Sequence, residues 1–310
     1  MAANSRRTAL VALGVLTLVW SYNWIVMKQV LRYSGPFEFA ALRSVLGSAV
    51  LFALLLARRE PLRPPPWLPV VLVGAAQTFA FQALVQWALV DGRAGKTALL
   101  AYTMPFWVVL LAWWLLGERP LLRAWIGLVV AAAGLALVLE PWQGLGGVES
   151  TLLALAGGLS WAFGVVLSKR LLARGTRVLS LTAWQMLAGT VGLCLLALLT
   201  DERPLQWTPA FIAALAYNGV LASGLAWVLW SYVVARLPAG LAGLSSLVIP
   251  VAGIGLAWAL LGERPSLPEA AGIVLIACAL AIVSLRGMRA PTGANASSRS
   301  VTSPETESRD

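Results

Sequence analysis

Polar side chains recur at helical spacing inside an apolar stretch that runs from residue 67 to residue 90. Thr78, Gln82 and Gln86 follow one another at intervals of four residues, and Gln77 precedes them. A helix places residues four apart on one face, so these side chains would form a polar stripe. Such groups are costly to bury in a membrane helix and mark solute pathways there. We therefore predict that Thr78 and Gln82 contact a solute.

Aromatic residues add to this pattern. Rings offer faces for stacking or for a cation, and amides can donate hydrogen bonds to a carboxylate, so together they would suit a small amphipathic solute. The alternative is that most of the 15 tryptophans lie at membrane–water boundaries, as we expect of Trp67, Trp142 and Trp207. The candidate binding residues are Trp20, Asn23, Thr78, Gln82, Tyr102, Trp161, Trp227 and Ser246.

Two prolines stand in the middle of apolar stretches. Pro105 and Pro250 remove a backbone donor, which frees the carbonyl groups of Ala101 and Ser246. The simpler interpretation is a kink alone. Because the proline recurs in both halves of the chain, we favour a helix break that exposes backbone to a central cavity.

Two charged residues enter the second apolar stretch together. Glu38 and Arg43 are five residues apart, which aligns them imperfectly on a helix. They are interpreted either as a gate or proton-linked pair, or as boundary residues whose charged ends reach water. We favour the boundary interpretation.

Several kinds of site are disfavoured. The chain has no histidine, and Cys194 and Cys278 lie far apart in apolar runs. We therefore expect no cofactor, no metal and no disulfide framework. A membrane-embedded transferase would need clustered acids or histidines and is disfavoured. The segment GRAGKT at residues 92–97 has Val90 where a phosphate loop needs glycine, so no nucleotide-driven engine is expected.

Composition indicates a protein that crosses the membrane many times. Of 310 residues, 59% are hydrophobic and 12% are charged, and the net charge is +10, whereas soluble proteins are roughly 25% charged. So apolar a surface leaves no polar face for nucleic acid. About 20 apolar residues span a bilayer. Ten such stretches occur, near 8–27, 37–57, 67–90, 94–116, 121–139, 151–168, 178–199, 208–234, 239–261 and 268–285.

The basic residues indicate the orientation of these spans. Fourteen Lys and Arg residues fall on the side of the N-terminus and six on the other side. Basic loops stay in the cytoplasm, so both termini are expected to be cytoplasmic. Residues 287–310 are rich in Pro, Ser, Thr and Glu and are expected to form a disordered cytoplasmic tail.

The chain also repeats itself. Residues 94–120 and 239–265 agree at 13 of 27 positions, including the prolines at 105 and 250, the tryptophans at 113 and 258, and a closing Gly-Glu-Arg-Pro. Trp20 pairs with Trp161 and Lys28 with Lys169 at a similar offset. Each half, 8–139 and 151–286, holds five spans. Five is an odd number, so the halves must enter the membrane in opposite directions.

Two five-helix halves, each with a mid-span proline and a Gly-Glu-Arg-Pro ending, resemble the EamA family of the drug/metabolite transporter superfamily. The resemblance implies an all-α bundle of ten transmembrane helices in two inverted repeats around a central cavity. It further implies a secondary exporter of amino acids or similar metabolites in the bacterial inner membrane, acting as a monomer or homodimer.

The resemblance leaves the substrate, the direction and the coupling open. Small-drug efflux and metabolite import by the same fold are alternatives. A receptor or scaffold without transport would not require the duplicated prolines.

Overall fold

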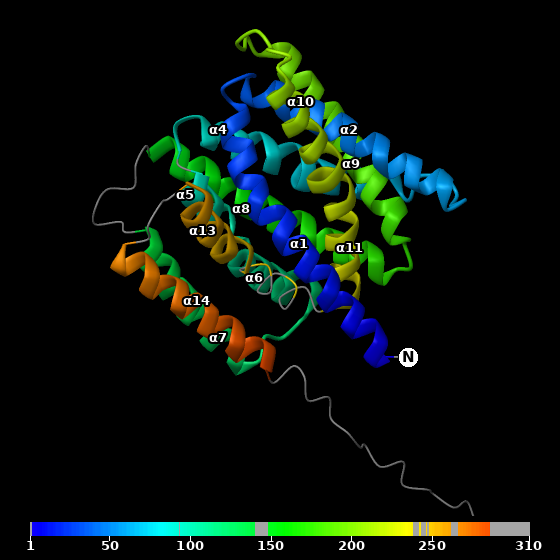
Figure 1. The fold of residues 1–310 in the computed structure, drawn as a ribbon. Helices are drawn as coiled ribbons and strands as arrows, with labels where there is room; N and C mark the ends of the chain where they lie inside the picture. Colours follow the sequence, from blue (N-terminus) through cyan, green and yellow to red (C-terminus); the bar gives the residue numbers. More distant parts are fainter. Residues whose placement is uncertain are drawn as a thin grey trace, which may run out of the picture.

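The computed structural model describes residues 2–92, 94–139, 148–237, 242, 246, 248–261 and 266–285, and this part of the chain contains helices but no strand (Figure 1). The first half holds α1 (Ala2–Val30), α2 (Pro36–Ala57), α3 (Trp67–Val73), η1 (Gly74–Ala80), α4 (Phe81–Asp91), α5 (Ala94–Ala101), α6 (Met104–Leu116) and α7 (Leu122–Leu139). The second half holds α8 (Val148–Ala173), α9 (Val178–Leu199), α10 (Pro209–Ala216), η3 (Tyr217–Leu225), α11 (Ala226–Arg236), α13 (Val248–Leu261) and α14 (Leu267–Leu285).

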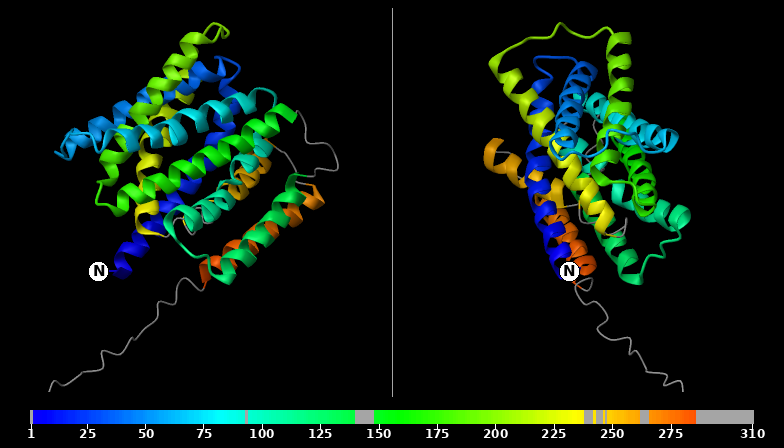
Figure 2. Two further views of the ribbon diagram at one scale, coloured as in Figure 1. Left: turned by 180° about the vertical axis from the view of Figure 1, so that it is seen from behind. Right: turned by 90° about the vertical axis from the view of Figure 1, so that its right-hand side faces the viewer.

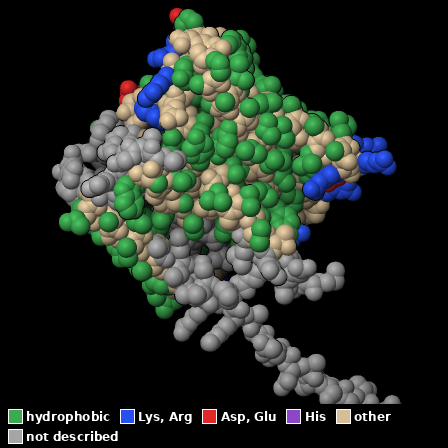
Figure 3. All heavy atoms as spheres, viewed as in Figure 1, with side chains coloured by type: hydrophobic (Ala, Val, Ile, Leu, Met, Phe, Trp, Pro, Cys, Tyr) green, Lys and Arg blue, Asp and Glu red, His purple; other side chains and the backbone are tan. Residues whose placement is uncertain are grey.

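Every predicted span contains a helix in this structure. Seven helical stretches are long and apolar enough to cross a membrane, and 122–137 forms a shorter apolar helix. Figure 3 shows hydrophobic side chains over most of the described face, with Lys and Arg gathered at opposite edges. The predicted tail, Trp142 and the second Gly-Glu-Arg-Pro lie outside the described residues.

The two halves are inverted repeats of one another. Their first helices, α1 and α8, run in opposite directions (Figure 2). Their third spans, α3–η1–α4 and α10–η3–α11, each contain a π-helical segment at corresponding positions. The prediction of an all-α membrane protein built from inverted repeats is confirmed.

The repeats cross each other where a second helix packs on the other half's π-helical segment. α2 packs against η3, and α9 packs against η1. Glycines allow both close approaches. A Cβ atom on Gly47 would lie 2.8 Å from the Cβ atom of Ser223, and one on Gly189 would overlap the Cβ atom of Thr78. Because both contacts join corresponding residues, the crossing follows the pseudo-symmetry of the repeats.

Each proline lies in the first turn of a helix, Pro105 in α6 and Pro250 in α13. α5 ends at Ala101 and α6 begins at Met104, so Pro105 occupies the first turn of a new helix, where a missing N–H costs little. The N–H of Phe106 donates to the Thr103 carbonyl at 2.9 Å. In the second half, the N–H of Ile249 donates to the Ser246 carbonyl at 3.0 Å, just before Pro250. The hydroxyl of Ser21 on α1 donates to the Ile249 carbonyl at 2.8 Å, so the first turn of α13 packs on the first helix of the other half.

The last helices of the repeats pack on each other. α7 and α14 lie side by side along one edge of the bundle in both figures (Figures 1 and 2). Gly134 brings them close, since a Cβ atom there would lie 2.7 Å from the carbonyl oxygen of Gly272. The central bundle is thus left to the first four spans of each half.

Candidate functional site

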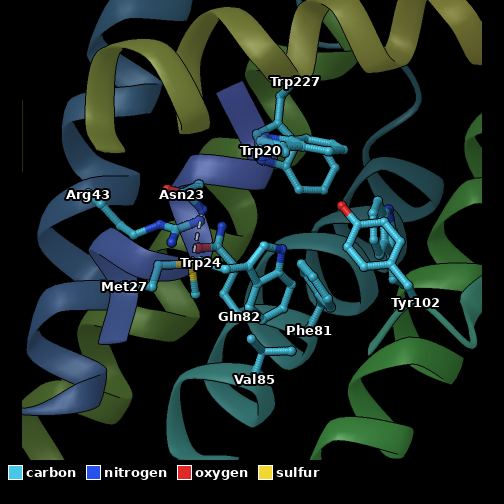
Figure 4. Close-up of a pocket in the computed structure, with 11 residues that line it drawn as sticks. Trp20, Asn23, Trp24, Met27, Arg43, Phe81, Gln82, Val85, Tyr102 and Trp227 are labelled. Atoms are coloured by element: carbon cyan, nitrogen blue, oxygen red, sulfur yellow. Dashed lines mark hydrogen bonds between the residues drawn. The ribbon is translucent and has the colours of Figure 1, made fainter. Parts of the chain in front are cut away.

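A small cavity lies between the two halves in the centre of the bundle (Figure 4). Its volume is about 30 Å³, which is enough to hold water but far too small for an amino acid. Both repeats contribute to its walls, since α1, α2, α4 and Tyr102 come from the first half and α8 and α11 from the second. The lining residues are Trp20, Asn23, Trp24, Met27, Arg43, Phe81, Gln82, Val85, Tyr102, Trp161 and Trp227.

Aromatic rings close this cavity by packing across the repeat boundary. The ring centroid of Trp20 lies 5.6 Å from that of Trp161 and 5.4 Å from that of Trp227. Tyr102 lies 5.4 Å from Trp161, and Phe81 lies 4.8 Å from the same ring. These spacings are typical of favourable edge-to-face and tilted pairs. A solute larger than water would have to separate these rings.

One tryptophan is fixed by a hydrogen bond to the opposite repeat. The Nε1–H of Trp20 donates to the carbonyl of Ala222 in η3 at 3.0 Å. In an α-helix the backbone carbonyls accept hydrogen bonds from N–H groups of the same helix. A π-helical segment leaves some carbonyls without such a donor, so they can accept hydrogen bonds from other groups. This contact ties α1 to the third span of the second half.

Polar groups converge on one end of the cavity. The guanidinium of Arg43 is directed from α2 toward the side-chain amides of Asn23 and Gln82 (Figure 4). Its Nε–H donates to the hydroxyl of Ser223 at 3.2 Å. The amide nitrogen of Asn23 lies 3.0 Å from the sulfur of Met27. Within the described part of the chain, Asn23 Oδ1 and both polar atoms of the Gln82 amide are buried without a hydrogen-bond partner.

The structure brings most of the predicted binding residues together. Trp20, Asn23, Gln82, Tyr102, Trp161 and Trp227 all line the cavity. Thr78 does not: it is fully buried, and its hydroxyl donates to Gln185 Oε1 on α9 at 2.8 Å. Ser246, also fully buried, is not among the lining residues. These two predicted positions therefore lie outside the lining of the cavity in this structure.

The side chains of the predicted polar stripe do not share one environment in the structure. Gln82 faces the cavity, whereas Gln77 accepts a hydrogen bond from the Ser168 hydroxyl at 3.3 Å. The amide of Gln86 lies 3.5 Å from the Met27 carbonyl. The π-helical segment η1 causes this division, because its i→i+5 bonding turns Thr78 away from the face that Gln82 occupies.

The boundary interpretation of Arg43 is wrong. Only 4% of this residue is exposed, and it lies against the cavity rather than at the membrane surface. α2 packs closely on η3 one turn further along, where a Cβ atom on Gly47 would lie 2.8 Å from the Cβ atom of Ser223. One feature of the sequence could have indicated this burial. Arg43 corresponds to Gln185 in the second repeat, at an offset of 142 residues, and Gln185 is also a polar residue inside an apolar span.

Four further lining residues were not predicted. Trp24, Met27, Phe81 and Val85 are apolar, so nothing in their type separates them from ordinary core residues. Once the rings separate, the arrangement would offer ring faces to a flat apolar body and polar groups to a polar end. Among the described residues, no cluster of acids and cysteines could hold a metal ion.

Comparison with known proteins places the chain in a family. The sequence model of the EamA-like transporter family matches residues 7–140 and 149–285. The transporter YvbV of Bacillus subtilis is 31% identical over 90% of this chain and 92% of its own length. An Escherichia coli protein named "Probable amino-acid metabolite efflux pump" is 26% identical over 92% of this chain and 97% of its own length.

One further relative and one solved structure are also similar to this chain. A Streptantibioticus cattleyicolor protein named "Probable terminal-alkyne amino-acid exporter" is 31% identical over 81% of this chain and 85% of its own length. A solved crystal structure superposes with a TM-score of 0.76 at 26% identity, over 90% of this chain and 99% of that one. The relatives are transporters and not enzymes. The chain belongs to the EamA-like transporter family, a multi-pass membrane family within the drug/metabolite transporter superfamily.

Proposed function

We propose that this protein is a secondary transporter that exports amino acids or related small metabolites. The observation that carries the proposal is the cavity at the boundary of the repeats. Trp20, Gln82 and Tyr102 of the first half meet Trp161 and Trp227 of the second half there. Inverted repeats that share a midplane site can expose it to either side in turn by rocking against each other.

The relatives support the choice of solute. Two of them carry amino acids in their names, as a metabolite efflux pump and as an exporter. The cavity offers what such a solute needs, namely ring faces for an apolar side chain and hydrogen-bonding groups for a polar end. Small-drug efflux would use the same rings, but the buried polar end of the cavity favours a solute with a charged group.

The proposal includes a location and an orientation. The protein would lie in the bacterial inner membrane with both termini in the cytoplasm, because the basic residues gather on the side of the N-terminus. It would act as a monomer or homodimer, and it would bind lipid and solute but no nucleic acid.

Transport is tested in liposomes that contain the purified protein. Vesicles loaded with a mixture of labelled amino acids should lose a subset of them faster than vesicles without protein. Gln82→Ala and Tyr102→Ala should each lower that flux at least several-fold without lowering the yield of folded protein. Gln77→Ala is the matched control, because Gln77 lies in the same span but contacts Ser168 outside the cavity.

Two results would contradict the proposal. If no amino acid or amphipathic drug crosses the vesicle membrane faster with protein than without it, the protein is not such a transporter. If Gln82→Ala and Tyr102→Ala both transport like the wild type, the solute passes elsewhere.

A further inference from the structure

Arg43 is a buried cation that has no acidic partner among the residues that the structure describes. The side chain is 4% exposed, and in the described part of the molecule its one hydrogen bond goes to the neutral hydroxyl of Ser223. The nearest acid along α2 is Glu38, which does not line the cavity. A charge inside the membrane is costly unless it is paired, so a lone guanidinium at this depth points to an anion that is supplied from outside the protein.

The groups around Arg43 are unsatisfied as well. Asn23 and Gln82 are 6% and 2% exposed, and three of their polar amide atoms have no partner among the described residues. Buried polar groups in folded proteins are nearly always hydrogen-bonded. The guanidinium and the Gln82 Nε2 atom both present donors to the same end of the cavity (Figure 4). A carboxylate, with two acceptor oxygens, matches the guanidinium fork and the Nε2 donor of Gln82, whereas Asn23 Oδ1 and Gln82 Oε1 are themselves acceptors and would need a donor group of the solute.

The other repeat shows that the helix crossing does not itself require the charge. Arg43 corresponds to Gln185, and Ser223 corresponds to Thr78. In the second pair, the Thr78 hydroxyl donates to Gln185 Oε1 at 2.8 Å. The same contact between a second helix and a π-helical segment is thus made once with a neutral amide and once with a cation. Only the cation lines the cavity.

We infer that Arg43 binds the carboxylate of the transported solute, with the amides of Gln82 and Asn23 beside it and the tryptophan cluster around the apolar body. The inference deepens the proposed function and rests on it. The pair of guanidinium and carboxylate is neutral, which lowers the cost of carrying a charged group through the membrane. A solute without an anion would leave Arg43 unpaired and should bind poorly.

Binding must also change the tryptophan cluster. The cavity of about 30 Å³ cannot hold an aromatic or aliphatic side chain, so the rings of Trp20, Trp161 and Trp227 must separate when a solute enters. Their fluorescence should therefore change when a solute binds, as a part of the emission of the 15 tryptophans of the chain. Phenyl compounds suit this measurement, because they add no tryptophan-like emission of their own.

The test compares three probes on the purified wild-type protein in nanodiscs. L-Phenylalanine carries a carboxylate and an ammonium group, 3-phenylpropionate carries the carboxylate alone, and phenethylamine carries the ammonium group alone. Tryptophan fluorescence and calorimetry should show binding of both carboxylates, and phenethylamine should bind at least tenfold more weakly. This comparison needs no variant.

A substitution then assigns the effect to Arg43. Arg43→Gln should fold, because Gln185 makes the corresponding contact in the other repeat. It should weaken binding of both carboxylates at least tenfold and leave phenethylamine unchanged. Arg58→Gln is the matched control: it is the same substitution at the exposed end of α2, and it should leave all three affinities unchanged.

The outcomes separate this inference from the proposed function. Equal binding of phenethylamine and 3-phenylpropionate, no binding of either carboxylate, or unchanged carboxylate binding by folded Arg43→Gln would each overturn the inference. Vesicle flux of amino acids that persists in Arg43→Gln would overturn it too, while transport itself would stand. Carboxylate-selective, Arg43-dependent binding without any flux would uphold the inference and contradict transport.

Discussion

Ser48 and Thr190 occupy corresponding positions of the two repeats, and their hydroxyl oxygens lie 3.2 Å apart. Two equivalent atoms can touch only close to the axis that relates them, so this pair marks the pseudo-two-fold axis. Trp20 and Trp161 are likewise equivalent and in contact. The axis therefore passes through both the α2–α9 crossing and the tryptophan cluster, and the cavity lies beside it.

The first prediction concerns this hydroxyl pair. Thr190 donates its single proton to the Met186 carbonyl at 2.8 Å, so Ser48 must be the donor to Thr190. Ser48→Ala and Thr190→Val should each lower the free energy of unfolding by about 1 kcal/mol. The double variant should lose less than the sum, because removing both partners leaves no orphaned group. Equilibrium unfolding in detergent gives the three values.

Ser44 provides the control for that cycle. It lies one turn before Ser48 on α2, and its buried hydroxyl has no partner among the described residues. Ser44→Ala and Thr190→Val should therefore be additive. Additivity of Ser48→Ala with Thr190→Val would instead show that the hydroxyls do not bond.

The second prediction concerns two equivalent lysines. Lys28 Nζ donates to the carbonyls of Leu89 and Val90 at 2.7 and 3.1 Å, at the end of α4. Lys169 Nζ donates to those of Val234 and Leu237 at 2.9 and 2.6 Å, at the end of α11. A cation at a helix C-terminus satisfies free carbonyls and favours the dipole.

Replacement by methionine keeps the apolar stem and removes this cap. Lys28→Met and Lys169→Met should each cost about 1–2 kcal/mol of unfolding free energy, and the double variant should cost the sum, because the sites are far apart. Arg32→Met and Arg170→Met are the controls, because both arginines are exposed and lie near the two lysines in the sequence. Neither control should change the free energy of unfolding. Thermal unfolding midpoints measure all five variants. An effect at only one of the two lysines would refute the equivalence.

The third prediction concerns a contact between the halves at the start of α2. The carboxylate of Glu202 accepts hydrogen bonds from the N–H groups of Phe37 and Glu38 at 2.9 and 2.7 Å. A carboxylate at a helix N-terminus satisfies free donors and favours the dipole. Gly35 makes room for it, because a Cβ atom there would overlap the carboxyl group of Glu202.

Gly35→Ala should therefore have the same effect as Glu202→Ala. Each should cost about 1–2 kcal/mol of unfolding free energy, and the double variant should cost no more than either alone. Asp201→Ala, at the exposed neighbouring position, should be neutral. Chemical unfolding curves distinguish these values, and a Gly35→Ala variant as stable as the wild type would contradict the overlap.

The fold could be predicted from the sequence because the long apolar stretches and the duplicated Gly-Glu-Arg-Pro ending can be recognised directly in it. The stretches predict the spans, and the duplicated ending predicts the repeat. The pairing of Trp20 with Trp161 followed from the same repeat. The departure of Thr78 from the face of Gln82 did not follow, because helical spacing assumes α-helical turns and η1 is π-helical. Arg43 was missed because its burial depends on Gly47 bringing α2 against η3, a contact between residues far apart in the sequence.

The packing of α7 on α14 has a consequence for how the protein can be made. The surface at Gly134 joins the two halves, and the α2–α9 crossing joins them again. A gene divided between codons 139 and 148 would thus yield two polypeptides that each carry complementary surfaces for the other. Co-expressed in one cell, they should assemble in opposite orientations in the membrane into a working carrier.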